Sequence, residues 1–325
     1  MRELTYSEAT LEALSEEMAA DPTIFVFGQG IGPRGGNFGT TIGLHALYGD
    51  MRLRDVGIYE RGFTGLCAGA AMTGSRPIVD YMMLDFALDA MGEMLNQIAK
   101  IQYMSSGRLK MPIVLRACIG LGGSMATHHS GNYFSYFVNH PGFRVVLPST
   151  PADAKGLLKS AIRCDDPVLF LEHRLLLKTV GAVPEGGDAI PFGQAAVRTQ
   201  GNDATVVALT AMVQQCVEVS TSLATDGISI EVIDPRTVAP LDMDTILASV
   251  RKTGRLLIVD ESFGPCGVGA EIATRVVEEA FDDLKAPIQR LNGAHVPMPY
   301  SAPLETAAIP QQEQIVAAVR DLLAV

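Results

Sequence analysis

The chain of 325 residues is long enough for two ordinary domains, and its 48% of hydrophobic residues can fill substantial cores. Its formal net charge of −11 is spread along the sequence without a basic cluster, which argues against a nucleic-acid partner. No apolar run approaches the roughly 18 uncharged residues of a membrane span, and the first residues carry acids where a signal peptide would carry bases. We therefore expect a soluble, cytoplasmic protein without membrane association.

The cysteines do not suggest a cross-linked or zinc-binding protein. Their number is odd, they are widely spaced, and no CxxC pair occurs: Cys67, Cys118, Cys164, Cys216 and Cys266. We expect them to act as small buried hydrophobic side chains.

Helices and short apolar strands alternate through the first half of the chain. Residues 5–18 predict a helix, because Thr5 and Glu8 have the spacing of a capping box and apolar residues follow on one face. Further strands are expected at 23–27, 77–83, 111–117, 144–147 and 168–172, and further helices at 65–71, 86–103 and 152–163.

A glycine-rich loop, GQGIGPRGGNFGTT, follows the first expected strand. It contains GxGxxG, and Asp50 lies about twenty residues further on, which is the outline of a dinucleotide site. Pro33 inside the turn weakens the match, as do the polar and β-branched residues 37–41 where a helix would be needed. A mobile or partner-contacting loop is the better interpretation.

Glu60 stands in apolar company at the end of a strand-like run, near Val56, Ile58 and Phe63. If its carboxylate is buried, it must be hydrogen-bonded or neutral, because burial disfavours the charged form. Such an acid can work as a catalyst. The alternative is that Glu60 begins the helix that follows, where a carboxylate complements the helix dipole. Spacing alone supports the two interpretations equally.

Two adjacent histidines, His128 and His129, lie in the loop GLGGSMATHHSG. Neighbouring side chains in a regular segment point apart, so the pair is not expected to bind one metal ion. Imidazole titrates near neutral pH, so either residue could serve as a hydrogen-bond donor or proton shuttle at the mouth of an active site. The alternative is a solvated pair on a surface loop.

The segment 183–201 is rich in glycine and proline and has no periodicity, which marks a domain boundary. Beyond it, short apolar strands alternate with helices and predict a parallel sheet covered on both faces. We predict an α/β fold of two domains, each a mainly parallel sheet with helices on both faces. The domains are expected at 1–185 and 201–325, with 186–200 as the linker.

Long segments then carry a family likeness. They are IYERGFTGLCAGAAMTGSRPIV, NQIAKIQYMSSG, HHSG with HPGFRVVLPSTPADAKGLLKSAIR, DPVLFLE, EVIDPRTVAPLD, SVRKTGR and MPYSAPLE. Over nearly its full length the chain resembles the β subunit of the thiamine-diphosphate-dependent E1 component of pyruvate, branched-chain 2-oxoacid and acetoin dehydrogenase complexes. The resemblance implies a pyrimidine-binding domain followed by a transketolase C-terminal-like domain. It also implies decarboxylation of a 2-oxoacid, or cleavage of acetoin, with acyl transfer to lipoamide.

The resemblance implies roles for particular residues. Glu60 matches the glutamate that hydrogen-bonds N1′ of the aminopyrimidine of thiamine diphosphate and promotes the imino tautomer, which takes the proton from the thiazolium C2. Phe86 matches the aromatic residue that stacks on this ring, and Ile58 and Met82 match apolar contacts near it. His129 matches a histidine that holds the substrate or intermediate and helps to acylate lipoamide.

Metal sites and partners follow from the same resemblance. Five residues match positions whose backbone carbonyls hold a structural potassium ion in some members: Ile113, Ala161, Ile162, Cys164 and Asp166. Relatives bind the diphosphate through Mg²⁺ on a GDG motif followed by Asn, and this sequence has no GDG. The chain would then hold half of a cofactor site and need an α subunit in an α₂β₂ heterotetramer. Further expected partners are a lipoyl-bearing E2 acyltransferase and a small-molecule substrate.

The chain departs from the family's usual residues at Gln29, Asp89, Gly92 and Glu93. These positions leave the substrate and the acyl acceptor open. One alternative is therefore a subunit of a split transketolase or of an acyloin-forming carboligase, although YERGF looks more like the E1 motif than the AEQ type of transketolases. An alternative of another class is a non-catalytic nucleotide- or flavin-binding α/β protein that uses the glycine loop.

Overall fold

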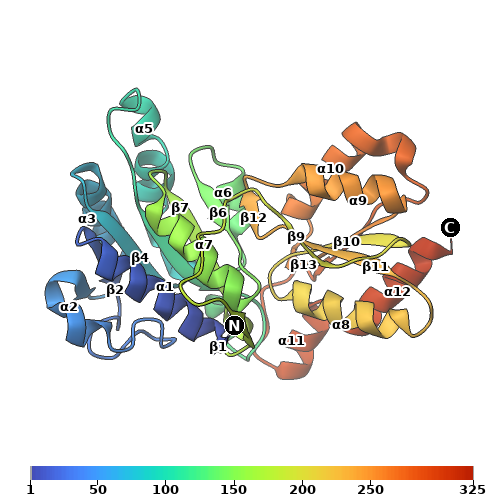
Figure 1. The fold of residues 1–325 in the computed structure, drawn as a ribbon, viewed down its shortest axis with the longest axis horizontal. Coiled ribbons are helices and arrows are strands. Elements are labelled where there is room, and N and C mark those ends of the chain that lie inside the picture. Colours follow the sequence, from blue (N-terminus) through green and yellow to red (C-terminus); the bar gives the residue numbers. More distant parts are fainter. Residues whose placement is uncertain (1, 325) are drawn as a thin grey trace. The chain divides into compact units, whose positions relative to one another are not determined.

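The computed structural model describes residues 2–324, which divide into two compact units (Figure 1). The first unit runs to Ile119 and resumes from Tyr136 to Phe192. The second unit consists of residues 120–135 together with the chain from Gly193 onward. This division differs from the boundaries expected from the sequence in one main respect, because segment 120–135 groups with the second unit.

The first unit is built on a parallel sheet with the strand order β6-β7-β5-β4-β2-β3. Its strands are β2 (Ile24–Gly28), β3 (Leu53–Asp55), β4 (Arg76–Met83), β5 (Val114–Ile119), β6 (Arg144–Val146) and β7 (Val168–His173). The principal helices are α1 (Tyr6–Ala20), α2 (Leu44–Arg52), α3 (Glu60–Met72) and α7 (Pro151–Arg163). A separate antiparallel pair joins β1 (Arg2–Thr5) to β8 (Val180–Val183).

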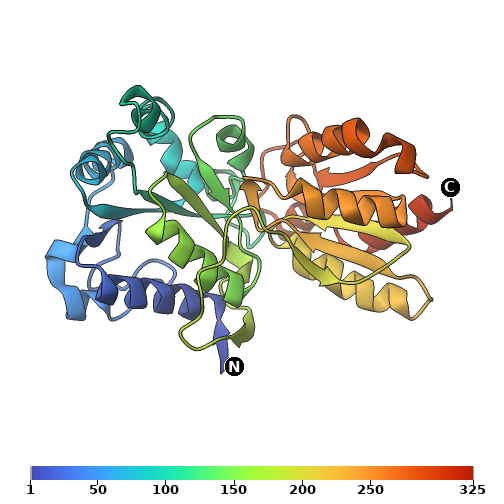
Figure 2. The same cartoon turned by 45° about the horizontal axis from the view of Figure 1, so that its top comes forward.

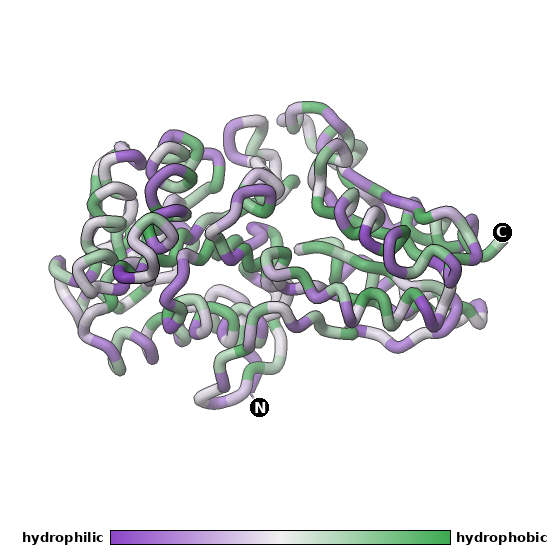
Figure 3. Tube along the Cα trace, turned by 90° about the horizontal axis from the view of Figure 1, so that it is seen from above, coloured by the Kyte–Doolittle hydropathy of each residue, from purple (hydrophilic) through white to green (hydrophobic). Residues whose placement is uncertain are grey.

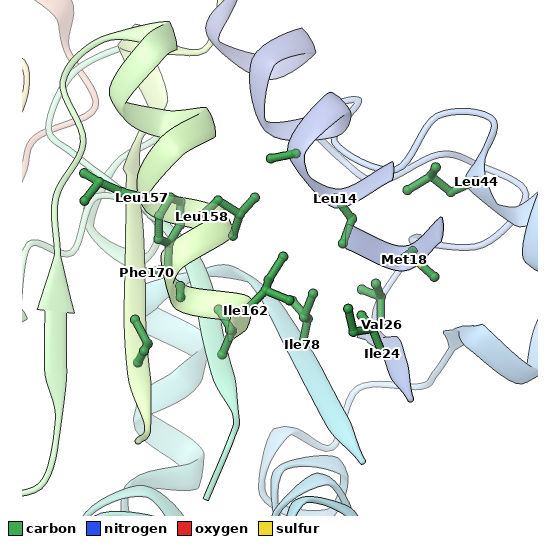
Figure 4. Packing of buried hydrophobic residues seen from close by; sticks show 14 of the residues in the cluster. Leu14, Met18, Ile24, Val26, Leu44, Ile78, Leu157, Leu158, Ile162 and Phe170 are labelled. Carbon is green, nitrogen blue, oxygen red and sulfur yellow. The ribbon is translucent and has the colours of Figure 1, made fainter. Parts of the chain in front are cut away.

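Helices α1 and α7 cover one face of this sheet. Leu14 and Met18 of α1 share a buried cluster with Leu158 and Ile162 of α7 and with Ile78 of β4 (Figure 4). Each such side chain contributes roughly 1.5–3 kcal/mol when it is removed from water. The helix α1 begins as expected, because Thr5 and Glu8 form the capping box.

The segment expected to be one helix over 86–103 is broken into several pieces. It comprises α4 (Leu84–Ala87), a 3₁₀ turn η1 (Leu88–Ala90), a π-helix η2 (Gly92–Ile98) and α5 (Ile101–Met104). A ring nitrogen of His140 lies 2.8 Å from the carbonyl oxygen of Leu95, and Gly142 packs so closely on Ala99 that an added Cβ would lie 2.1 Å from its carbonyl oxygen. Contacts with distant parts of the chain therefore determine where this helix is broken. The apolar periodicity of residues 86–103 contains no information about those contacts.

The second unit contains a sheet with the strand order β14-β13-β10-β11-β9, in which β9 is antiparallel to β11 and the other neighbours are parallel. The strands are β9 (Ala196–Thr199), β10 (Ala204–Ala208), β11 (Ile230–Asp234), β13 (Leu256–Phe263) and β14 (Gln289–Gly293), and a short β12 (Thr237–Ala239) also occurs. Strand β9 lies inside the range expected to be a linker.

Helices cover both faces of this second sheet, with α9 and α10 on one face and α8 and α12 on the other (Figures 1 and 2). Their bounds are α8 (Met212–Ala224), α9 (Met243–Thr253), α10 (Val268–Ala280) and α12 (Gln312–Leu323), and the remaining helical elements are α6 (Phe134–Val138), α11 (Ala302–Ala308), η3 (Thr127–His129), η4 (Arg174–Leu176) and η5 (Phe281–Asp283). The trace of the helices alternates between hydrophilic and hydrophobic residues (Figure 3), as amphipathic helices require. The predicted architecture of two mainly parallel sheets with helices on both faces is confirmed.

Cys67, Cys118 and Cys216 are buried as expected, whereas Cys164 is half-buried and Cys266 is exposed in the loop before α10, so the expectation of burial is wrong for Cys266. Within residues 2–324, none of the helices has both the length and the apolar character that a bilayer crossing requires.

Candidate functional site

Glu60 is both the first residue of α3 and a buried acid. Its exposed fraction is 6%, and the side-chain amide of Gln29 donates to its Oε1 atom at 3.1 Å. The carboxyl group therefore lies at the positive end of the helix dipole and accepts a hydrogen bond from a neutral amide. The two interpretations offered by the sequence, helix start and buried acid, are therefore met by the same residue.

A buried hydroxyl pair lies behind Glu60 and fixes the first turn of α3. The Thr64 hydroxyl donates to the backbone carbonyl of Glu60 at 2.6 Å and lies 2.6 Å from the phenol oxygen of Tyr81. Burial raises the pKa of Tyr81, so the phenol stays neutral. Phe63 packs on the Tyr81 ring at a centroid distance of 5.7 Å and on Tyr59 at 5.9 Å. This packing holds the carboxylate in one place.

The position of these groups in the sheet is that of a ligand site in an open α/β fold. Strand β2 is followed in the chain by β3 on one side, whereas β4 pairs with the other side of β2. The strand order thus reverses between β2 and β4, and ligands bind outside the carboxyl ends of strands at such a point. Gln29 directly follows β2, Met82 lies at the end of β4, and Phe86 lies in α4, which follows β4 directly.

The backbone at Met82 is held in an unusual conformation. Its φ is 66°, and its amide donates to Oδ1 of Asp80 at 2.9 Å, where the pairing of β4 with β5 is irregular. A positive φ is rare for a residue with a side chain, and sites of this kind gather near functional groups. Burial raises the pKa of Asp80, while the nearby Arg116 guanidinium opposes that shift. The hydrogen bond to Asp80 therefore fixes the backbone of Met82 at the end of β4.

Sequence reasoning missed the ion pair beside Asp80. Arg116 in β5 and Glu172 in β7 are each 2% exposed and form two hydrogen bonds, with Nη2 2.9 Å from Oε1 and Nε contacting Oε2. A buried pair of this kind is tolerated because its charges are matched and hydrogen-bonded. The available signal was a single charged residue in each of two apolar strands, VLRACI and VLFLEH.

Phe86 and Ile58 differ in how this chain surrounds them. Phe86 is half-buried in α4, whereas Ile58 is 83% exposed. The apolar surround that the sequence suggested for Glu60 therefore comes from Phe63 and its neighbours and not from Ile58. Three further large apolar side chains in or near α3 are exposed: Tyr59, Leu66 and Leu88. Apolar side chains grouped on a surface in this way are typical of an interaction face.

Two of the departures from the family's usual residues now have defined surroundings. Gln29 is the donor to Glu60, a role that an acid at this position could fill only when protonated. Glu93 in η2 accepts from Nε of Arg61 at 3.0 Å, and its Oε2 is buried without a hydrogen-bond partner among the described residues. Asp89 and Gly92 are exposed, and nothing in the structure explains these two departures.

The histidine loop belongs to the second unit. His128 is exposed and His129 is half-buried in the turn η3. Glu305 of α11 accepts from the backbone amide of Ser124 at 3.0 and 3.1 Å, and Glu261 of β13 accepts from Asn132 at 3.0 Å. Glu60 belongs to the first unit, so the structure assigns the two expected catalytic residues to different units.

A cavity of about 420 Å³ adjoins the histidine loop within the second unit. Its lining is mainly apolar and includes the buried Ser130, whose hydroxyl has no hydrogen-bond partner among the described residues. The lining residues are Leu121, Thr127, Ser130, Tyr133, Phe263, His295, Val296, Pro297 and Met298. The ring of His295 packs edge-on against Phe263 at 5.4 Å.

The carbonyl oxygens expected to hold potassium meet a different cation. Nη1 of Arg76 donates to the carbonyl oxygens of Ile162 and Cys164, at 3.0 Å in each case. The carbonyl oxygen of Ala161 accepts from the Cys164 amide at 3.3 Å, and that of Ile113 accepts from the Val168 amide at 3.0 Å. The side chain of Asp166 pairs with Arg144. Donors already bind four of the five expected carbonyls, and two of these accept from the permanent positive charge of Arg76, which disfavours an additional cation on this set.

The side chains in the described part of the chain include no group of three or more His, Cys, Asp or Glu that could hold a metal ion.

Both halves of the chain match known protein families. Residues 2–179 match the family described as the transketolase pyrimidine-binding domain, and residues 193–315 match the transketolase C-terminal domain. The chain is 43% identical to the pyruvate dehydrogenase E1 component subunit β-2, mitochondrial, of Oryza sativa subsp. japonica, over 98% of this chain and 86% of that protein. It is 42% identical to the acetoin:2,6-dichlorophenolindophenol oxidoreductase subunit β of Cupriavidus necator, over 98% and 97% respectively.

A solved structure titled split gene transketolase, inactive β4 tetramer, has the same fold, with a TM-score of 0.82, 22% identity and coverage of 99% of both chains. The family and relative matches support the E1 interpretation over the nucleotide- or flavin-binding alternative. The structure agrees, because a GxGxxG site needs a helix directly after the glycines and the next helix begins only at Leu44. The chain therefore belongs to the family of β subunits of thiamine-diphosphate-dependent E1 components, built from the transketolase pyrimidine-binding and C-terminal domains.

Proposed function

We propose that this chain provides the pyrimidine half of the cofactor site in an E1 enzyme that acts on a 2-oxoacid or on acetoin and passes the acyl group to lipoamide. The observation that carries the proposal is Glu60, a buried carboxylate at a helix start, oriented by Gln29 at the switch point of a parallel sheet. A carboxyl group in this position can hold or move a proton at N1′ of an aminopyrimidine.

The residues around Glu60 fit such a ring. Thiamine diphosphate, when bound, supplies the carbanion chemistry that cleaves the bond next to the carbonyl group. Phe86 in α4 offers an aromatic face for the ring, and Met82, whose amide donates to Asp80, lies at the end of β4. Ile58 would become buried against the ring or the partner subunit. His129 would bind the substrate or the acyl group as a hydrogen-bond donor.

The rest of the site is assigned to partners. An α subunit in an α₂β₂ heterotetramer would bind the diphosphate and its Mg²⁺, because this sequence has no GDG motif. The exposed apolar residues Ile58, Tyr59, Leu66 and Leu88 suit such a partner face. A lipoyl-bearing E2 would accept the acyl group, and a cytoplasmic location stays part of the proposal.

The test is the substitution Glu60→Gln in the enzyme assembled with its α subunit. The introduced amide keeps a hydrogen-bond acceptor but cannot exchange a proton with the ring, so we expect proton exchange at C2 of bound thiamine diphosphate to slow by roughly 100-fold or more. The enzyme is mixed with deuterated solvent, the exchange is stopped with acid, and NMR measures the C2 proton that remains. Thermal unfolding checks that the fold is intact.

Glu271→Gln is the matched control. Glu271 is also an acid in the first turn of a helix, α10, but it is exposed. Its substitution removes a charge that complements a helix dipole, but at a position outside the proposed cofactor site. Proton exchange at C2 of thiamine diphosphate should therefore stay at the wild-type rate. Wild-type exchange in Glu60→Gln would remove the assignment.

A further inference from the structure

One turn of the first unit is organised around a guanidinium group. The turn joins α7 to β7 and presents the carbonyl oxygens of Ile162 and Cys164 toward the start of β4. Nη1 of Arg76, the first residue of β4, lies 3.0 Å from both oxygens. One nitrogen therefore bridges two carbonyls, which is the arrangement that a monovalent cation would otherwise make.

The charge of this guanidinium is balanced on its other edge. Nη2 of Arg76 lies 2.6 Å from Oδ1 of Asp165, and Nε lies 3.8 Å from Oδ2 of Asp21. The carbonyl oxygen of Asp165 accepts from the side chain of Gln102 at 2.7 Å and from the Met111 amide at 3.1 Å. The turn is thus bonded to β4 through Arg76, and to α5 and the segment before β5 through Asp165.

A potassium ion on the same carbonyls would lie next to a permanent positive charge. Arginine is not deprotonated in proteins, so it cannot make way for an ion by losing its charge. Each carbonyl has two lone pairs, but an ion that used the second pair on Ile162 and Cys164 would be held close to Nη1. Mutual repulsion disfavours that arrangement where the side chain is only 25% exposed.

We propose that Arg76 is the resident cation of this turn and that the chain needs no bound potassium to order it. The guanidinium does for residues 161–166 what a structural potassium ion would do: it neutralises converging carbonyl dipoles and ties the end of α7 to β4. The inference concerns only the first unit and is independent of the proposed catalytic function.

The test compares thermal unfolding of the purified full-length chain in potassium, sodium and choline chloride at equal ionic strength. We expect the wild-type Tm to be the same in potassium and choline within about 1 °C. Arg76→Ala exposes the carbonyls, so its Tm in choline should fall by about 5 °C, and potassium should restore part of the loss in a saturable way.

Arg52→Ala is the matched control. Arg52 also donates to backbone carbonyls, with Nε 2.8 Å from Ile24 and Nη2 2.9 and 2.8 Å from Met18 and Asp21. These carbonyls belong to a helix end and the start of a strand, so the Tm should fall with no recovery specific to potassium. Arg76→Lys keeps a positive charge, and it should stay indifferent to potassium.

Two results would overturn the proposal. The first is a saturable rise of the wild-type Tm with potassium but not with choline. The second is an Arg76→Ala protein whose Tm is unchanged or does not respond to potassium. If Arg76→Ala folds only in potassium, the proposal is supported. If it folds in no salt, the wild-type series and Arg76→Lys decide, because potassium dependence in either contradicts a resident guanidinium.

Discussion

The contact between Gln29 and Glu60 links a departure from the family's usual residues to the central acid of the site. The amide of Gln29 donates to the carboxyl group of Glu60 at 3.1 Å. Gln29 directly follows β2 and Glu60 is the first residue of α3, so both backbones are held by regular structure. A neutral donor gives the buried Glu60 carboxyl a hydrogen-bond partner without adding a second acid. Two carboxyl groups at this distance would have to share a proton.

We predict that Gln29→Glu makes folding stability depend on pH. The folded variant must hold a proton between two carboxyls that the unfolded chain releases, so its unfolding free energy falls as the pH rises. At about pH 7 the loss should be roughly 1–3 kcal/mol relative to wild type, and it should shrink at about pH 5. Urea unfolding at the two pH values measures it.

The control for this variant is Gln200→Glu, which places an acid at an exposed position of the second unit, away from Glu60. It should show the pH dependence of the wild type. Equal pH dependence of the two variants would contradict a shared proton between residues 29 and 60.

At the scale of elements, the histidine loop is held by two buried acids on different parts of the second unit. Glu305 in α11 is 5% exposed and bonds the amide of Ser124, whose φ of 54° is itself unusual. Glu261 in β13 accepts from the amide of Leu121 at 3.3 Å and from Asn132. Carboxyl groups that accept from backbone amides in this way fix a loop that contains no β-strand of its own.

We predict that Glu305→Ala loosens this loop and leaves the rest of the second unit folded. Removing a charged acceptor should cost the loop roughly 1.5–3 kcal/mol, which corresponds to amide hydrogen exchange about 10 to 100 times faster over residues 121–131. Mass spectrometry of exchanged peptides measures this. Glu313→Ala changes an exposed acid at the start of α12 and should leave those peptides protected. Unchanged protection in Glu305→Ala would refute the anchoring role.

At the scale of the whole molecule, the proposed function makes this chain one side of a cofactor site. Glu60, Met82 and Phe86 belong to the first unit and His129 to the second, and Ile58 is left exposed. The sequence has no GDG motif. Under the proposed function, we therefore expect the diphosphate and its Mg²⁺ to be bound by groups from another chain.

We predict that the isolated chain binds thiamine diphosphate with Mg²⁺ at least about 100-fold more weakly than the chain assembled with an α subunit. The diphosphate contacts are missing, and a loss of roughly 3 kcal/mol corresponds to that factor. Isothermal titration of each form, at matched Mg²⁺ concentration, measures it. Comparable affinity of the isolated chain would contradict the half-site. The α subunit alone is the second control, and it should also bind weakly.

Much of the architecture could be predicted from local pattern. The capping box at Thr5, the alternation of apolar strands with helices, and the start of a helix at Glu60 are set by residues within a few positions of one another, and the structure contains each of them. The break in the helix over 86–103 could not be predicted, because it depends on His140 and Gly142 from a distant segment.

The sequence by itself thus determined the fold class, the order of the elements and the family, because these depend on periodicity, capping and long matching segments. Only the tertiary structure decided that Gln29 meets Glu60, that Arg116 pairs with Glu172, that residues 120–135 join the second unit, and that Arg76 fills a turn of carbonyls. The physical reason is common to all four. Each depends on groups brought together across the fold from separate segments, and no local pattern in a single chain encodes such a meeting.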